Sequence, residues 1–484
     1  MKLIGISLGL VLLAMTSVRL AAESTDHKFS VKPHQPGDKS LGADTVDRIE
    51  WSDSLGKPRS VDLVTKSDRY NTGWLSQYVY DDPAITCRAM DDGVGGVSDI
   101  SHMEVGAGGT KWRPQKGDED QAASAPKLTW IFKGDNHGIV RAEYDLHYIK
   151  DKKPSAKPFH IVRDLFFTAG TDNFGYAITM DFSGVPKNDC SVDTRSPYVK
   201  WGFTGEPMGP YTGFRSGTDS TLTCLDTQAK DAKLIKTIGD NIIPYNVIWD
   251  GPKDRVCAII GTRPYAELPQ GSEYWTGSSE PIVPAGSYDR DKLEAWKLPY
   301  QVGAYSGWLN KLTWQTHFQL GYEEVKFGKD YKVKAWPKYS YGVMILLDHL
   351  SAKQHDRLIK EGEGIQSVKL TASVGMVAVS GPAGPGREKE KADLKIQGYD
   401  PIYRVWRAAC VKNKLHLSMD LGATTLFHPV FIVERYSKTK APALSLNGKA
   451  LKNGTEFLAS LDKKNSRLYL TLLDTLKDKV EVTF

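Results

Sequence analysis

The sequence predicts a mainly β protein, with a large antiparallel β-sandwich followed by a smaller C-terminal β-sandwich and few short helices. Three observations predict this class. Apolar and polar residues alternate with period 2 along much of the chain, most clearly over residues 139–149. Clusters of Gly, Pro, Asn and Asp separate these stretches. Helical spacing is confined to short segments, which excludes the regular strand–helix alternation of a parallel α/β fold.

Each predicted element has the residue pattern of its type. Further strands are expected at 128–132, 161–167, 176–182, 246–249, 256–261, 312–320 and 341–347, where β-branched and aromatic residues recur between turn signals. The best helix is 351–361, with weaker candidates at 227–236 and 289–296. In the tail, Asn447-Gly448 predicts a tight hairpin turn, and strands are expected at 468–473 and 480–484.

The length and the breaks in the pattern predict more than one domain. A single core stops growing at roughly 250–300 residues, whereas this chain has 484. A Gly- and Pro-rich stretch at 380–386, followed by the charged run 387–391, suggests a boundary. We therefore expect a signal peptide at 1–22, a large sandwich domain at 23–350, a helix and linker region at 351–386 and a C-terminal sandwich at 387–484.

The first residues have the features of a cleavable signal peptide. Lys2 precedes an apolar run at 3–15, and Leu20-Ala21-Ala22 offers small residues for cleavage before Glu23. No later stretch approaches the roughly 18 uncharged apolar residues of a membrane span. The expected location is therefore secreted or periplasmic, without stable membrane insertion.

The charge and the cysteine content limit which partners and which kinds of site the sequence suggests. The net charge of +5 comes from 63 basic and 58 acidic residues that are interleaved, so no basic stripe for nucleic acid is visible. A modest basic excess suits an acidic polysaccharide or oligosaccharide substrate. None of the five cysteines forms a C-x-x-C pair, so neither a zinc site nor a redox motif is indicated.

A resemblance to carbohydrate-active enzymes lies in the tail. The pattern consists of Asn447-Gly448, Gly454, Phe457, Asp462 and the strand 468–472. It is similar to the terminal β-sandwich modules of secreted carbohydrate-active enzymes. A large antiparallel domain followed by a small sandwich also resembles polysaccharide lyases with a mutarotase-like supersandwich. The likeness covers about the last 80 residues at motif level and only architecture elsewhere, so no catalytic residue is carried over from it.

The sequence lacks the signature motifs of several common enzyme classes. There is no H-E-x-x-H, no P-loop and no G-x-G-x-x-G, which argues against zincins, P-loop NTPases and typical dinucleotide enzymes. The G-x-S-x-G match at 5–9 lies within the predicted signal peptide. No cofactor is indicated, although the Asp- and Gly-rich segment 91–99 could offer oxygens to calcium; an ordinary turn is the alternative.

Aromatic residues gather in predicted loops beside arginines. The largest such segment runs from Trp201 to Arg215, and companion segments contain Arg263, Trp275 and Trp308. Aromatic faces stack on sugar rings, and a guanidinium grips a carboxylate or sulfate with two hydrogen bonds. The alternative is that these aromatics only pack the ends of the sandwich.

Two predicted strands carry a polar face. Arg141, Glu143, Asp145 and His147 lie on one side of the strand at 139–149, and Gln315, His317 and Gln319 lie on one side of 312–320. Such a row could form the floor of a cleft. It could equally be the solvent-facing side of an antiparallel sheet.

These residues suit β-elimination on a uronate-containing glycan, which needs a base, an acid and a group that neutralises the carboxylate. The candidate base is His147 or His317, the acid is Tyr211, and the clamp is Arg215 or Arg263. The expected substrate-binding residues are Arg141, Trp201, Trp275 and Trp308. Two alternatives remain: a glycoside hydrolase using Glu143, Asp145 or Glu206, and a glycan-binding protein without catalysis.

Overall fold

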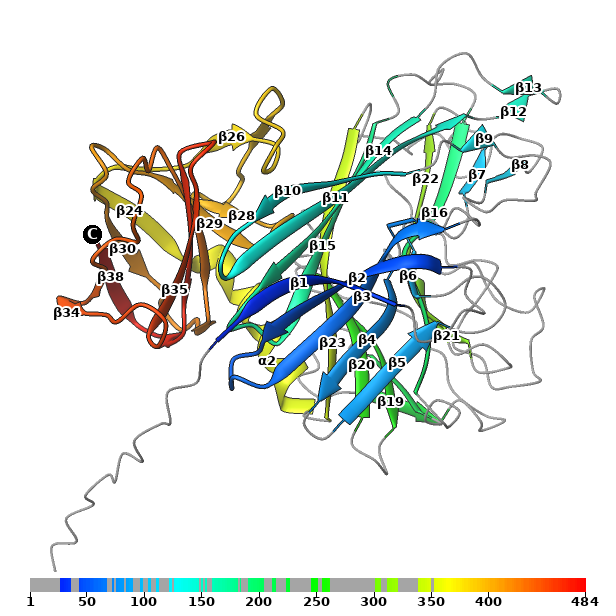
Figure 1. Cartoon of the computed structure of the whole chain (residues 1–484), viewed down its shortest axis with the longest axis horizontal. Coiled ribbons are helices and arrows are strands. Elements are labelled where there is room, and N and C mark those ends of the chain that lie inside the picture. The colour runs from blue at the N-terminus through cyan, green and yellow to red at the C-terminus, as the bar shows by residue number, and fades with distance from the viewer. Residues whose placement is uncertain are drawn as a thin grey trace, which may run out of the picture.

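The computed structural model describes most of the predicted strands and the whole C-terminal part (Figure 1). The described residues are 27–35, 43–67, 72–73, 75–81, 84–89, 96–98, 103–105, 110–112, 122–123, 126–147, 149–150, 153–154, 159–181, 183, 190–203, 211–214, 223–226, 245–250, 255–261, 301–305, 311–320, 338–349 and 352–484. Strands dominate among these residues, which confirms the predicted mainly β class.

Two large antiparallel sheets form the first part of the molecule. The first has the order β1 (Phe29–His34), β2 (Ala43–Ser52), β3 (Pro58–Ser67), β4 (Leu75–Asp81), β5 (Ala84–Ala89), β16 (Cys190–Phe203), β22 (Lys311–Leu320) and β21 (Gln301–Tyr305), with β6 (Gly96–Ser98), β7 (Met103–Val105) and β8 (Thr110–Trp112) off this path. The second has the order β10 (Lys127–Lys133), β11 (His137–His147), β14 (Phe159–Thr168), β15 (Asn173–Asp181), β23 (Lys338–His349), β20 (Arg255–Gly261), β19 (Tyr245–Asp250), β17 (Tyr211–Phe214) and β18 (Thr223–Asp226), with β9 (Ala122–Ala123) paired to β11. A separate ribbon joins β12 (Ile149–Lys150) to β13 (Lys153–Pro154).

An aromatic cluster fills the space between the two large sheets. Trp51 of β2 contacts Phe167 of β14 with ring centroids 5.5 Å apart, and Phe174 lies beside both rings. The Trp51 indole also donates a hydrogen bond to the Thr171 carbonyl at 2.9 Å. Aromatic contacts between facing sheets, with the polar N–H satisfied, are the usual solution for a buried Trp.

One helix follows the large sheets. The helix α2 (Ala352–Gly364) continues into the 3-10 turn η4 (Ile365–Ser367), so the predicted helix at 351–361 is confirmed and extends three residues further. Leu358 and Ile359 pack on buried residues of β20 and β23. Among the residues that the structure describes, no helix is long and apolar enough to cross a membrane.

The C-terminal part is a smaller sandwich of two main sheets. One has the order β24 (Lys369–Val374), β30 (His416–Asp420), β38 (Lys479–Thr483), β33 (Ser445–Leu446) and β34 (Lys449–Ala450). The other has the order β25 (Met376–Val377), β29 (Val405–Ala409), β32 (Val430–Glu434), β36 (Arg467–Leu472) and β35 (Phe457–Asp462), with β28 (Tyr399–Asp400) beside β29. Two short ribbons add β26 (Ser380–Pro382) with β27 (Lys391–Asp393), and β31 (Leu426–Phe427) with β37 (Thr475–Leu476).

The predicted turn at Asn447-Gly448 joins β33 to β34. Both residues have positive φ, 50° and 77°. A two-residue hairpin of this kind requires left-handed backbone at both positions, which Asn and Gly tolerate best. The dipeptide therefore fixes this hairpin.

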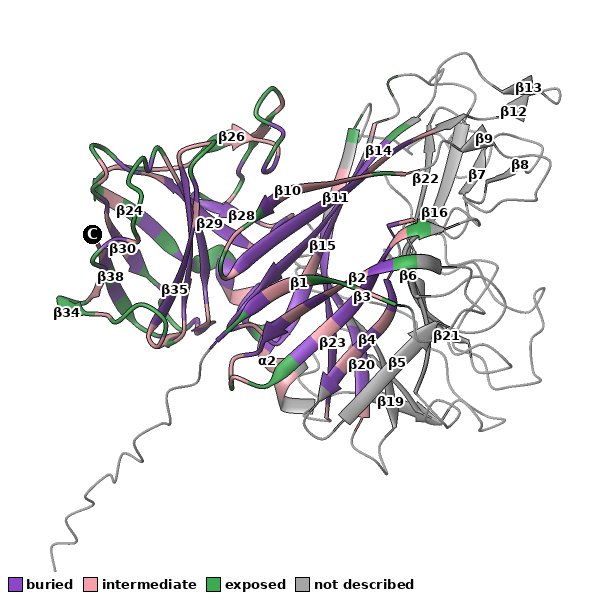
Figure 2. Ribbon diagram, viewed as in Figure 1, coloured by how far each residue is buried: buried purple, intermediate pink, exposed green. Residues whose placement is uncertain are grey.

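The C-terminal sandwich covers the second face of the second large sheet. Phe132 of β10 stacks on Tyr469 of β36 with centroids 4.4 Å apart. Ile139 and Phe166 join the same buried cluster as Val405 and residues of β32. The middle of β14 is therefore enclosed on both sides, and Figure 2 shows the resulting continuous burial. We call this contact between strands β10, β11, β14 and β15 and the C-terminal sandwich the seam.

Candidate functional site

The strands that carry the sequence-predicted catalytic residues lie in different sheets. His317 is in β22 of the first sheet and pairs with Asp193, and Trp201 is in β16 of the same sheet, opposite Ala89. His147 ends β11 of the second sheet, and Tyr211 begins β17 of that sheet.

Strand order separates His147 from Tyr211, whereas His317 and Tyr211 both lie on strands that neighbour β19. Six inter-strand steps separate β11 from β17, which is roughly 29 Å at about 4.8 Å per step. His147 and Tyr211 are therefore too far apart along the sheet to act on one glycosidic bond. By contrast, β17 pairs with β19, and β19 contacts β22 of the other sheet. The strands of Tyr211 and His317 are therefore both neighbours of β19.

Several predicted residues lie outside the described part of the chain. These are Arg215, Arg263, Trp275, Trp308 and Glu206. Most of the Asp- and Gly-rich segment at 91–99 lies outside it too, with β6 as the described part. Within the described residues, no group of three or more His, Cys, Asp or Glu side chains is placed to hold a metal ion.

Arg141 is described in full and belongs to the seam. Its side chain is buried and forms two hydrogen bonds of 2.7 Å with the Asp164 carboxylate. It also donates to the carbonyl oxygens of Pro385 and Gly386 at 2.7 and 3.3 Å. The Tyr403 hydroxyl donates to the same carboxylate at 2.6 Å. These contacts hold the Arg141 guanidinium inside the protein, where it is bonded to protein groups rather than open to a substrate.

The other polar residues of β11 differ from Arg141 in exposure. Asp145 is half-exposed and pairs with His160 of β14 at 2.8 Å. Glu143 is of intermediate exposure, opposite Lys127 of β10 and Val162 of β14. The polar row is therefore buried at one end, where the C-terminal part covers it, and open further along.

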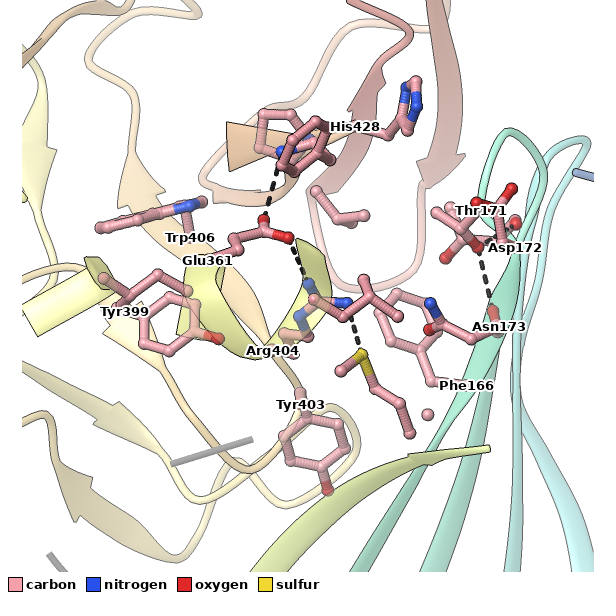
Figure 3. Close-up of a pocket in the computed structure, with 18 of the residues that line it drawn as sticks. Phe166, Thr171, Asp172, Asn173, Glu361, Tyr399, Tyr403, Arg404, Trp406 and His428 are labelled. Carbon is pink, nitrogen blue, oxygen red and sulfur yellow. Dashed lines mark hydrogen bonds and ion pairs between the residues drawn. The ribbon is translucent and has the colours of Figure 1, made fainter. Parts of the chain in front are cut away.

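A pocket lies where α2, the second large sheet and the C-terminal sandwich meet (Figure 3). We call it the seam pocket. Its polar lining includes Asp172 from the β14–β15 turn, Arg357 and Glu361 from α2, and Arg404 and His428 from the C-terminal sandwich. Its volume is about 60 Å³. That is room for a few water molecules, since one needs roughly 10–15 Å³, and is far below the roughly 300–1,000 Å³ of small-molecule sites.

Two ion pairs neutralise the seam pocket. Glu361 accepts a hydrogen bond of 2.6 Å from Arg404 and a second of 3.3 Å from the Phe427 backbone N–H. Asp172 pairs with Arg357 at 2.7 Å and accepts two hydrogen bonds from Ser54, from the hydroxyl at 2.6 Å and from the backbone N–H at 3.1 Å. Each carboxylate therefore links elements that are distant in sequence.

The surroundings shift the pKa values of the two carboxyl groups in opposite directions. Burial raises the pKa of Glu361, although Arg404 opposes the shift. Burial would also raise the pKa of Asp172, but the charges of Arg59 and Arg357 hold it below its usual value. Burial lowers the pKa of His428, which favours the neutral ring. Opposed shifts of this kind also occur in catalytic acid–base pairs, but this pocket is too small for a sugar.

Two residues of the seam pocket have strained backbone. Arg404 and His428 have φ of 55° and 48°, the left-handed region that non-glycine residues seldom adopt. Such conformations persist only where the surrounding contacts enforce them. Here the ion pair to Glu361 and the packing of the seam supply that enforcement. Nothing in the local sequence at Arg404 or His428 predicted these conformations.

A larger hollow opens on the solvent side of the same helix. It has a volume of about 660 Å³ and shares Arg357, Glu361 and Phe427 with the seam pocket. Its remaining lining mixes acidic, basic and hydroxyl side chains from α2 and the 423–425 loop. The Arg357 guanidinium covers one face of the Phe427 ring at 4.7 Å.

Comparison with known proteins gives only distant structural similarities. No protein-family profile matches the sequence, and no curated protein does either. A putative aldose 1-epimerase from Klebsiella pneumoniae aligns over 69% of this chain and 88% of its own, with 11% identity and a TM-score of 0.36. The aldose epimerase homologue from C. elegans aligns over 67% and 100%, with 8% identity and a TM-score of 0.28. The galactose 1-epimerase from Lactobacillus acidophilus aligns over 67% and 100%, with 8% identity and a TM-score of 0.30.

Proposed function

We propose that the protein is exported and cleaves an acidic, uronate-containing polysaccharide by β-elimination. In this reaction the base removes the proton at C5, the C4–O bond breaks, and the electron pair of the C–H bond becomes the C4=C5 double bond. The acid donates its proton to the departing glycosidic oxygen, so that no water is consumed. A cationic group neutralises the carboxylate and lowers the cost of the carbanion-like transition state.

One observation supports the assignment of base and acid. The strands of His317 and Tyr211 are connected through β19, whereas β11 with His147 lies six steps from β17. We therefore propose His317 as the base and Tyr211 as the acid. Arg215 follows Tyr211 by four residues, and either Arg215 or Arg263 remains the proposed carboxylate clamp. Trp201, Trp275 and Trp308 remain proposed sugar-binding aromatics.

The test is to incubate the protein with a panel of acidic polysaccharides and follow ultraviolet absorbance of the unsaturated uronate. Absorbance should rise, and His317→Asn and Tyr211→Phe should each reduce the rate by about 10²–10⁴-fold, the usual contribution of acid–base catalysis. His147→Asn is the matched control and should leave the rate unchanged. New reducing ends without absorbance would contradict elimination and indicate a hydrolase. Binding without any cleavage would indicate a glycan-binding protein.

A further inference from the structure

A groove crosses the exposed face of β1–β4, away from the seam. Its volume is about 590 Å³, within the roughly 300–1,000 Å³ range of small-molecule sites. Its lining comes from four adjacent strands of the first sheet: Lys28, Phe29, Ser30, Lys32, Arg48, Glu50, Trp51, Ser52, Pro58, Arg59, Ser60, Gln77 and Val79. We call it the β1–β4 groove.

The strand register arranges the polar side chains of the groove in two rows. One row runs through Ser30, Glu50 and Ser60. The other runs through Lys32, Arg48, Asp62 and Gln77. Residues paired across strands share a face, and the intervening residues such as Trp51 and Arg59 are buried in the core. The groove is thus built on one mostly polar face of the sheet, with the apolar Val79 opposite Ser60.

Cations outnumber carboxylates on this face. Lys28, Lys32 and Arg48 line the groove and are not buried. The same face carries two carboxylates, that of Glu50, which lines the groove, and that of Asp62, which is buried and bonded to Arg48. Arg59 also lines it, but its guanidinium is buried and bound by Asp53 and Asp348. The groove therefore attracts anions, and the hydroxyl and amide groups beside the cations can bond to uncharged polar atoms of a ligand.

The ion pairs of Lys32 and Arg48 leave these two cations accessible to a ligand. Lys32 contacts Glu50 at 3.2 Å, with both side chains largely exposed, 68% and 42%. Exposed pairs of this kind contribute only about 0–1 kcal/mol, so a ligand anion can replace Glu50 at small cost. Arg48 binds Asp62 through Nε and Nη2 at 2.8 and 3.0 Å. That pair holds the guanidinium in place and leaves Nη1 outside the two bonds.

We infer that the β1–β4 groove is a binding site for an anionic polysaccharide, with Lys32 and Arg48 holding carboxylate or sulfate groups. That the anionic ligand is a glycan rests on the proposed function. The anion site itself rests on the volume, the register and the charges of the groove. An ordinary solvent-facing sheet has no need of a hollow of this size.

The test is direct binding of the full mature chain to a uronate polymer, a sulfated polysaccharide and neutral dextran, measured by calorimetry at low and physiological salt. Lys32→Glu should weaken binding by about tenfold, which is about 1.4 kcal/mol. Glu50→Gln should strengthen it, because the competing carboxylate is gone. The changes in affinity caused by both variants should shrink as the salt concentration rises, since exposed charges are screened. The affinities for the uronate polymer and for the sulfated polysaccharide should show which anion the groove prefers, and dextran should not bind.

The matched control is Lys438→Glu, which makes the same charge change in an exposed loop of the C-terminal sandwich. If Lys438→Glu weakens binding as much as Lys32→Glu, only net charge matters and the groove is not the site. If Glu50→Gln weakens binding, the proposed competition is wrong.

Cleavage is scored separately from binding. Binding that depends on Lys32 without any cleavage would support the groove and contradict the lyase. Cleavage and binding that are both unaffected by Lys32→Glu would support the lyase and contradict the groove.

Discussion

The seam pocket and the β1–β4 groove contain similar side chains in opposite physical states. In the pocket, Glu361 and Asp172 are buried and each is bound by an arginine at 2.6–2.7 Å. In the groove, Lys32 and Glu50 form an exposed ion pair at 3.2 Å. The pocket holds about 60 Å³ and the groove about 590 Å³. Charge in the pocket is therefore used for structure, whereas charge in the groove is available to a ligand.

This difference gives a criterion for locating function on a β-rich surface. A cluster of charged residues is not by itself a site, because a buried and fully paired cluster serves to hold two parts together. The useful signs are accessible volume and charged side chains whose ion pairs are exposed enough for a ligand to replace them. The following predictions test that criterion, beginning with the largest expected effect.

Arg404→Met should destabilise the protein most. It leaves the buried carboxylate of Glu361 without its partner, and breaking a buried pair from one side costs about 3–5 kcal/mol. Methionine is as strained as arginine at positive φ, so the comparison isolates the charge. The measurement is urea unfolding. The double variant with Glu361→Gln should recover part of the loss, and a loss below about 1 kcal/mol for the single variant would show that the pair is dispensable.

His137→Gln should change how stability depends on pH. The His137 ring is buried between Ser460 and Thr471, with hydrogen bonds of 2.9 and 2.8 Å. Burial lowers its pKa from 6.5 to about 3. Since the unfolded chain binds the proton first, the stabilising contribution is complete above pH 6.5 and is lost as pH falls toward 3, by up to about 1.4 kcal/mol per unit.

The variant should lose about 1–3 kcal/mol at neutral pH and have a flatter profile below pH 6.5. The control is His34→Gln, at the end of β1 where the side chain is of intermediate exposure, which should keep the slope of the parent protein. An unchanged slope in His137→Gln would mean that the ring is not held neutral.

The effect of Glu390→Gln on stability should be smaller than that of His137→Gln, and it should appear in a lower pH range. Hydrogen bonds from Arg387, with further help from Lys338, lower the pKa of Glu390 from 4.5 to about 2. Its contribution is therefore present above pH 4.5 and lost as pH falls toward 2. Because the side chain is about one third exposed, screening limits the effect to about 1 kcal/mol or less. Thermal unfolding across this window should show a shallower decline in the variant, and equal declines would contradict the assignment.

Lys32→Gln should have the smallest effect on stability. Its side chain is 68% exposed, so the change in unfolding free energy should stay within about 0.5 kcal/mol. Binding of an anionic polysaccharide should nevertheless fall. A stability loss close to that of Arg404→Met would remove the distinction between the groove and the seam pocket.

The fold class and many of its elements could be predicted from the sequence because they depend on local pattern. The period-2 alternation at 139–149 marks β11, and Asn447-Gly448 marks the turn from β33 to β34. The alternation could not show that Arg141 is buried. That burial depends on Asp164 in the next strand and on a loop some 245 residues away, which no local pattern encodes.

The groove was missed although a local signal was present. In β2, Arg48 and Glu50 alternate with the buried Ile49 and Trp51, which is the pattern of a half-buried strand. What the sequence lacks is the alignment of four such strands, since register is set by pairing and by bulges. The domain bounds at 23–350, 351–386 and 387–484, the signal peptide and the lyase chemistry remain predictions.

The position of β23 determines when the second large sheet can finish folding. This strand is the last of the second sheet to be made, yet it lies between β15 and β20 and pairs with both. Until residues 338–349 emerge, the two halves of that sheet have unpaired edges, which are prone to misassociation. The large sandwich must therefore finish folding after most of its chain has been synthesised, and a chain exported during synthesis would need its exposed edges protected over that interval.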